Sequence, residues 1–176
     1  MTCKATQYQD ADILCGKDVN PYIGGEIPII GNALLVDKTS LFTSVTTSSV
    51  QTATVAFIGT SEGTLHKALV EGEGSGGASR IYKSIQLTPD SQPLLQDSAL
   101  DEKNGYLYVM SKSSLYKVNI RLCSQSADCH SCLAASDPYC GWCMKQSACL
   151  VQEVCDADAI NPKVDWLNYK SGRCPL

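Results

Sequence analysis

Ten cysteines form the pattern with the most chemical potential in this 176-residue sequence. Cys3 and Cys15 lie near its beginning. The other eight lie in the last third, at Cys123, Cys129, Cys132, Cys140, Cys143, Cys149, Cys155 and Cys174. Two C-x-x-C pairs occur among them, Cys129-x-x-Cys132 and Cys140-x-x-Cys143. Such a pair can be half of a zinc site, a redox-active dithiol, or the ends of two different disulfides.

Zinc and redox chemistry each leave part of this pattern unexplained. Zinc bound by the two C-x-x-C pairs would give no role to the four other cysteines of the same short segment. Cys140-Gly141-Trp142-Cys143 has the spacing of a thioredoxin-like site, which depends on a helix N-terminus within a βαβ unit. The flanking sequence predicts no such unit. An intracellular zinc-binding or redox protein is therefore the less favoured alternative.

A disulfide-stabilised module explains all eight cysteines of the last third. An even number of closely spaced cysteines is typical of secreted modules. A short segment with Trp142 and Trp166 buries little apolar surface, and each disulfide adds about 2–4 kcal/mol of stability. Cys140 and Cys143 would then have different partners, with Trp142 filling the interior and Asp137-Pro138 forming the turn before them. Spacing alone leaves roughly a hundred pairings open.

The first 121 residues predict a mainly β structure without an amphipathic helix. β-Branched and aromatic residues, bounded by Gly, Ser and Asn, predict strands. The expected strands lie at residues 52–60, 64–70, 80–87, 105–110 and 114–120. Two stretches, TVAFIGTSEGTLHKALV and NGYLYVMSKSSLYKVNI, resemble each other at a spacing of roughly 50 residues, which is typical of a propeller blade. A propeller needs at least roughly four blades, so we expect this chain to be a fragment of a longer one.

Three glycines in the loop at residues 71–77 match the spacing of a dinucleotide-binding fingerprint. That fingerprint requires the glycines to open a helix whose N-terminus faces a pyrophosphate. Glu71 and Glu73 lie in this loop, and the next segment alternates like a strand. The loop is therefore interpreted as a flexible hairpin connection.

The string Asp137-Pro138-Tyr139-Cys140-Gly141-Trp142-Cys143, with the cysteines around it, resembles the PSI domain of plexins, semaphorins and integrins. Residues 43–70 and 107–120 resemble the end of a sema domain, and plexins in particular. The resemblance implies two domains, the C-terminal portion of a sema β-propeller at 1–121 and a PSI domain at 122–176. The fold class expected is mainly β, with the last two or so blades of a seven-bladed propeller. The strand that completes the family's last blade comes from the N-terminal end of the propeller and is missing here.

The resemblance also implies specific pairs and structural residues. The expected disulfides are Cys123–Cys140, Cys129–Cys174, Cys132–Cys149 and Cys143–Cys155, with Cys3–Cys15 closing a short loop late in the sema domain. The residues expected to support the module are Trp142, Gly141 and Pro138.

Catalysis and nucleic-acid binding find no support in the remaining residues. A net charge of −4 and the absence of a basic run argue against nucleic-acid binding. His66 and His130 have no sequence-local partner that suggests a triad or a metal site. No apolar stretch approaches the roughly 20 residues of a membrane span, and the N-terminus does not read as a secretory leader. We expect neither an enzyme nor a bound cofactor or metal.

The resemblance implies an extracellular piece of a plexin-type semaphorin receptor, a single-pass cell-surface protein that acts in signal transduction such as axon guidance and cell migration. The expected partners are a semaphorin-type ligand of the full receptor, the remaining blades, and following immunoglobulin-like modules. The PSI domain would act as a rigid spacer. A semaphorin or a receptor of the hepatocyte growth factor type is the alternative within the same fold. Cut out of a propeller, the fragment is expected to be marginally stable or self-associating.

Overall fold

The structure of this protein is a computed structural model that describes residues 31–71, 78–156, 165–170 and 172–175. The chain divides into two compact units, Met1–Ala33 and Leu34–Leu176. All helices and strands reported below belong to the second unit. The expected Cys3–Cys15 bridge lies outside the described residues.

Four antiparallel strands form the first sheet, in the order β1-β2-β3-β4. The strands are β1 (Phe42–Val50), β2 (Ala53–Thr60), β3 (Thr64–Val70) and β4 (Arg80–Gln86). Three of them coincide with expected strands. β1 was not expected, because its run of Ser and Thr carries little alternation of apolar and polar residues.

Three antiparallel strands form the second sheet, in the order β5-β6-β7. They are β5 (Leu94–Asp101), β6 (Tyr106–Ser111) and β7 (Leu115–Asn119). β6 and β7 correspond to expected strands, whereas β5 is polar along most of its length and its pairing with β6 is irregular between Leu94 and Ser98. The sequence repeat maps onto β2–β3 and β6–β7, the second and third strands of their sheets.

Glycine is required in the tight turn between β2 and β3. Gly63 has a φ of +75°, a conformation that other residues rarely adopt. A Cβ atom there would lie 1.7 Å from Oγ1 of Thr88. The other glycine-rich connection links β3 to β4, and the element that follows it is a strand and not a helix. That arrangement lacks the helix that phosphate binding requires.

The cysteine module contains short elements that the sequence did not predict. They are α2 (Cys129–Ala134), β8 (Gly141–Cys143), β9 (Ala148–Leu150), α3 (Gln152–Asp156) and β10 (Trp166–Asn168), and the strands form a sheet in the order β10-β8-β9. Asp128 caps α2: its carboxylate accepts a hydrogen bond from the backbone N–H of Ser131 at 2.9 Å.

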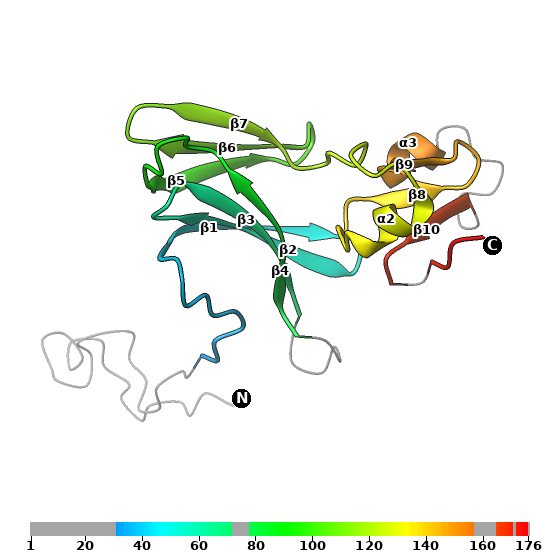
Figure 1. Cartoon of the computed structure of the whole chain (residues 1–176), viewed down its shortest axis with the longest axis horizontal. Helices are drawn as coiled ribbons and strands as arrows, with labels where there is room; N and C mark the ends of the chain where they lie inside the picture. Colours follow the sequence, from blue (N-terminus) through cyan, green and yellow to red (C-terminus); the bar gives the residue numbers. More distant parts are fainter. Residues whose placement is uncertain (1–30, 72–77, 157–164, 171, 176) are drawn as a thin grey trace, which may run out of the picture. The chain divides into compact units, whose positions relative to one another are not determined.

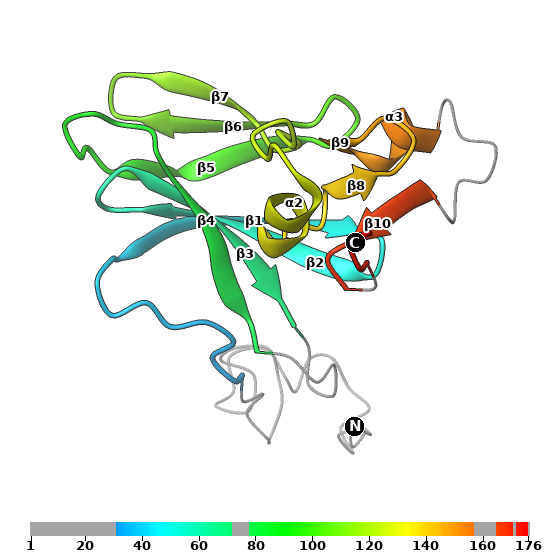
Figure 2. The same ribbon diagram turned by 45° about the vertical axis from the view of Figure 1, so that its right-hand side comes forward.

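One apolar core runs from the two sheets into the cysteine module. β1 lies beside β5, and the module lies against one end of the sheets, as Figures 1 and 2 show from two directions. The buried residues of this core are Val55, Phe57, Leu65, Leu94, Leu107, Val109, Ile120, Cys123, Cys129, Cys132, Tyr139, Cys140, Trp142 and Cys149. Because sheet residues and cysteines belong to the same cluster, the sheets supply part of the interior that the small module could not build alone.

Candidate functional site at the junction of the sheets and the cysteine module

Four disulfides join the eight cysteines of the module. The pairs are Cys123–Cys140, Cys129–Cys174, Cys132–Cys149 and Cys143–Cys155, with Cα–Cα distances of 5.4 to 5.8 Å. These distances are usual for disulfides. The pairs are the four that the family resemblance implies for this segment.

Each cysteine of the two C-x-x-C pairs is bridged to a cysteine outside its own pair. A sulfur in a disulfide is not a thiolate, and thiolates are what zinc binding and redox attack require. Among the described residues, no group of three or more His, Cys, Asp or Glu side chains is placed to hold a metal ion. The eight cysteines of the module therefore act as cross-links in this structure.

All seven residues from Asp137 to Cys143 are buried. The backbone N–H of Cys140 donates to the carbonyl of Asp137 at 3.0 Å, which closes a turn with Pro138 at its second position. The backbone N–H of Tyr139 donates to Oδ1 of Asp137 at 3.1 Å. The local sequence thus folds back on its own aspartate, and the turn directs the following residues into the module.

Gly141 is glycine because the ring of Trp166 and the backbone of Leu167 lie against its α-carbon. A Cβ atom on Gly141 would lie 2.2 Å from the ring of Trp166 and 2.6 Å from the carbonyl oxygen of Leu167. Trp142 points to the other side of β8 and packs in the core with the cysteines. Trp166 packs with Cys143 and Cys155 in a separate cluster. The two tryptophans therefore fill opposite faces of the same short sheet.

Lys67 of β3 joins the first sheet to the buried motif. Its ammonium Nζ lies 2.5 Å from Oδ2 of Asp137 and donates to the carbonyl of Ile120 at 2.9 Å. The two charged side chains are only 4% and 8% exposed. Breaking a buried pair of this kind leaves a charge without compensation, which is strongly unfavourable.

Two tyrosines surround this ion pair. The hydroxyl of Tyr82 in β4 donates to Oδ1 of Asp137 at 3.2 Å. The ring centroids of Tyr82 and Tyr139 each lie 5.3 Å from Nζ of Lys67, within the range of a cation–π contact. Burial lowers the pKa of Lys67, and the charge of Asp137 opposes that shift. Burial also raises the pKa of both tyrosine hydroxyls, so they stay protonated at neutral pH.

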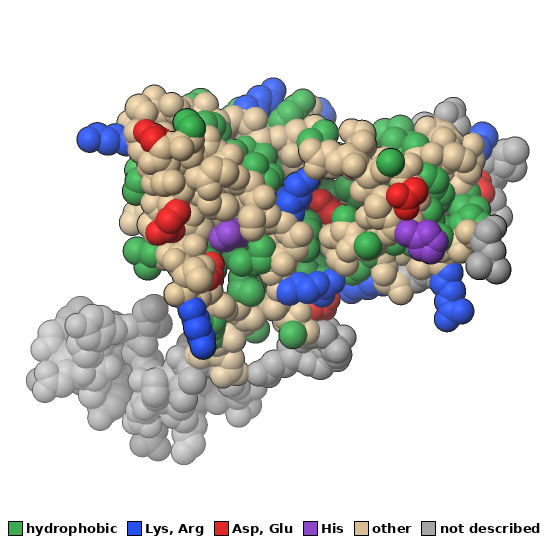
Figure 3. Space-filling model, viewed as in Figure 1, with side chains coloured by type: hydrophobic (Ala, Val, Ile, Leu, Met, Phe, Trp, Pro, Cys, Tyr) green, Lys and Arg blue, Asp and Glu red, His purple; other side chains and the backbone are tan. Residues whose placement is uncertain are grey.

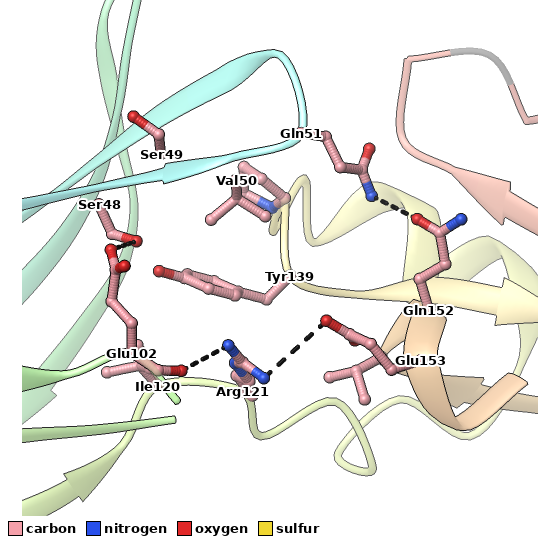
Figure 4. Close-up of a pocket in the computed structure, with 12 residues that line it drawn as sticks. Ser48, Ser49, Val50, Gln51, Glu102, Ile120, Arg121, Tyr139, Gln152 and Glu153 are labelled. Carbon is pink, nitrogen blue, oxygen red and sulfur yellow. Dashed lines mark hydrogen bonds and ion pairs between the residues drawn. The ribbon is translucent and has the colours of Figure 1, made fainter. Parts of the chain in front are cut away.

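A pocket of about 190 Å³ opens next to Tyr139, between β1 and the cysteine module (Figure 4). Its floor is the ring of Tyr139, and the β1–β2 turn faces α3 across it. Gln51 donates to Gln152 at 3.2 Å across the opening. Arg121 donates to the carbonyl of Glu102 at 2.6 Å and lies 4.0 Å from Glu153. Exposed contacts of this kind contribute little stability, so the buried pair is the stronger link.

The two histidines make their described contacts away from the ion pair, although His66 directly precedes Lys67 in β3. His66 is buried in β3, with Nδ1 2.8 Å from the hydroxyl of Ser84 and Nε2 3.9 Å from the carboxylate of Asp37. His130 is exposed on α2. Ser84 and Asp37 come from distant parts of the sequence, so sequence inspection gave no indication of either contact.

Lys67 and the ionic role of Asp137 were missed by sequence reasoning, although a signal for Lys67 is present. Strand residues alternate between faces, so Lys67 lies on the same face of β3 as Leu65 and Leu69, which are both 1% exposed. A lysine between two apolar residues of one strand face predicts a buried charge that needs a partner. Asp137 gave no comparable signal, because an aspartate before proline is already explained by the turn.

The visible surface carries no concentrated charge. Acidic and basic side chains are scattered over the face drawn in Figure 3. Within the described ranges, no helix has the length and apolar character that crossing a bilayer would need.

Two protein families match this chain, each over different residues. The Sema domain family matches residues 1–101, and the plexin repeat family, PSI, matches residues 122–175. Human Plexin-A2 is 34% identical over 144 residues, which cover 82% of this chain and 8% of Plexin-A2. Plexin-A4 of Danio rerio is 34% identical over 156 residues, which cover 89% of this chain and 8% of that protein.

Solved structures give the same relationship in three dimensions. The full extracellular region of Plexin A4 matches with a TM-score of 0.74 and 28% identity, over 96% of this chain and 16% of that one. A chain from the complex of Drosophila Plexin A with Semaphorin 1b matches with a TM-score of 0.62 and 20% identity, over 77% of this chain and 29% of that one. At that identity the second match concerns the fold alone. The present chain spans about 8% of the length of the curated relatives it matches.

Proposed function

The chain belongs to the Sema domain family and carries a plexin repeat after its sema part, and on this premise we propose that it forms a rigid junction in the extracellular region of a plexin-type semaphorin receptor. In this proposal residues 1–121 are the C-terminal part of the propeller and residues 122–176 are the PSI domain. The junction acts by structure and not by catalysis. It holds the ligand-binding propeller at a fixed angle to the modules that follow.

One observation carries the proposal: the core and the Lys67–Asp137 pair are shared by the sheets and the module. Two domains joined by a flexible linker would each have a core of their own and meet through a more polar surface. Here the ion pair is buried between them and Phe57 of β2 lies 6.4 Å from the ring of Tyr139. A junction built in this way resists bending.

The three-stranded second sheet fits the same proposal. On the described chain β7 has a neighbour on one side only, β6. The first sheet has four strands, so the second is one strand short of a full blade. In the whole receptor a strand from elsewhere in the propeller would pair with β7, and the remaining blades would cover the outer face of this sheet.

A semaphorin-type protein is the proposed ligand of the whole receptor, at the extracellular side of the plasma membrane, in signalling such as axon guidance. The structures of similar fold named above include a complex of Drosophila Plexin A with Semaphorin 1b. The two described sheets make up only part of a propeller, so on their own they are expected to bind such a ligand weakly or not at all.

The spacer role is tested by inserting a flexible Gly/Ser segment between Arg121 and Leu122 in the receptor that contains this chain. Semaphorin binding should be retained, because the propeller is intact, while signalling should be lost, because the angle is no longer fixed. The control is the same segment inserted between Ser113 and Ser114, in an exposed turn. Signalling that survives the insertion after Arg121 would refute the spacer role.

The disulfide set is tested separately by peptide mapping of the unreduced protein. The expected linked peptides contain the four module pairs together with Cys3–Cys15. A bridge between Cys140 and Cys143, or a free thiol in the module, would contradict the proposed set.

A further inference from the structure

Lys67 meets acceptors from two segments that are distant in sequence from β3. The carbonyl of Ile120 belongs to the end of the second sheet, and the carboxylate of Asp137 belongs to the module. The disulfide between Cys123 and Cys140 ties these two segments together next to the acceptors. The ammonium therefore lies where both sheets and the module meet.

Asp137 is held from two sides as well. One carboxylate oxygen, Oδ2, faces Lys67, and the other, Oδ1, accepts from the hydroxyl of Tyr82 and the backbone N–H of Tyr139. Lys67 and Tyr82 come from β3 and β4, which pair in the same sheet. A change in the angle of the module would move Asp137 away from both strands together.

The sequence repeat provides an internal comparison for Lys67. The Leu-x-Lys pattern of Leu65 and Lys67 in β3 recurs as Leu115 and Lys117 in β7. Lys67 is 3% exposed, whereas Lys117 is exposed and lies 3.9 Å from the ring centroid of Tyr106. The lysine of the repeated pattern is thus buried in the first sheet, whose face receives Asp137, and exposed in the second sheet.

We propose that Lys67 and Asp137 are the residues that select a single docking angle of the module on the first sheet, an inference that rests on the spacer function proposed above. Apolar contacts such as that of Phe57 with Tyr139 are non-directional and tolerate a range of angles. A buried ion pair tolerates few docking angles, because an angle that separates the two charges leaves both desolvated and uncompensated. The apolar core holds the module on the sheet, and the ion pair determines its orientation.

The test uses the full 176-residue chain. Pulsed electron paramagnetic resonance measures the distance between a label on the sheets and a label on the cysteine module. Nitroxides are attached through a ketone-bearing amino acid at Lys112 and His130, so that the cysteines keep their bridges. Both positions are exposed, one after β6 and the other on α2. Dilution with unlabelled chain suppresses distances between molecules.

The decisive variant is Lys67→Met with Asp137→Asn, which removes both charges while the amide keeps an acceptor for Tyr82 and Tyr139. The unsubstituted chain should give one narrow distance distribution. The double variant should give a broadened or shifted distribution while its disulfides stay intact. Lys117→Met, the matched control from the repeat, should leave the distribution unchanged. If the double variant fails to fold, Lys67→Arg replaces it: the planar guanidinium needs a different geometry, so the mean distance should shift.

The outcomes separate this inference from the function on which it rests. An unchanged narrow distribution in the double variant, or an unchanged mean in the Lys67→Arg replacement, would overturn the role of the ion pair and leave the spacer function intact. A broad distribution in the unsubstituted chain would overturn the spacer function, and the role of the pair with it.

Discussion

At the scale of single residues, the junction depends on a lysine placed among apolar side chains. Removing an ammonium from water costs several kcal/mol, and the lowered pKa of Lys67 reflects that cost. Asp137, the Ile120 carbonyl and two tyrosine rings offset it. The arrangement is stable only while all of these groups stay in contact.

Lys67→Met alone should destabilise the chain by about 3–5 kcal/mol, because it leaves the carboxylate of Asp137 buried without its partner. Lys117→Met removes an exposed cation–π contact and should cost less than about 1 kcal/mol. Urea unfolding of the two variants measures both values. Equal costs for the two lysines would contradict the buried pairing.

Asp128 should make the cap of α2 sensitive to acid. Hydrogen bonds from the backbone and side chain of Ser131 lower the pKa of Asp128 below its ordinary value of 3.8. The folded state then binds fewer protons than the unfolded state, so this contribution is complete above pH 3.8 and is lost as the pH falls through the lowered pKa. Asp128→Asn should keep the cap and remove its acid-dependent contribution to the free energy of unfolding. Urea unfolding from about pH 2.5 to about pH 6, the range in which carboxyl groups titrate, measures this contribution. An unchanged pH dependence would count against this role.

At the scale of elements, strands β8 and β10 approach each other closely at a glycine. Their pairing brings the ring of Trp166 over Gly141. The exposed faces of the larger strands behave differently. Met110 of β6 and Leu115 of β7 are paired neighbours, 37% and 66% exposed. The β8–β10 contact leaves no room for an added atom at Gly141, whereas the β6–β7 pair leaves apolar surface exposed.

Gly141→Ala should separate β8 from β10. The added methyl group would overlap the Trp166 ring, and overpacking of this kind typically costs about 1–3 kcal/mol. Gly31→Ala is the control, because a Cβ atom at Gly31 meets nothing within 4 Å. Thermal unfolding followed by tryptophan fluorescence compares the two. A Gly141→Ala protein as stable as the control would show that the strands can part without cost.

Self-association should occur through the open side of the second sheet. An unpaired edge and an apolar face invite pairing with another chain. Substituting both Met110 and Leu115 by Lys should weaken the association, whereas Val154→Lys, at an exposed apolar residue of α3, should not. Sedimentation velocity over a range of concentrations measures this. A chain that stays monomeric at every concentration would refute the expectation.

At the scale of the whole molecule, sequence patterns revealed the strands rich in β-branched and aromatic residues, but not the junction. β2, β3, β4, β6 and β7 were predictable because β-branched and aromatic residues cluster in them. β1 and β5 were not, since their polar composition becomes strand only through pairing with neighbours. The disulfide partners followed from family resemblance and not from spacing. The Lys67–Asp137 contact joins residues 70 positions apart, and such a contact has no local signature.

The measurement that tests the central claim most directly is equilibrium unfolding in urea followed by two probes at one protein concentration. Both tryptophans, Trp142 and Trp166, lie in the cysteine module, so their fluorescence reports on the module. Far-ultraviolet circular dichroism reports mainly on the longer strands of the two sheets. If the sheets and the module share one core, the two transitions should coincide. Two separate midpoints, with the module unfolding independently of the sheets, would contradict the rigid junction.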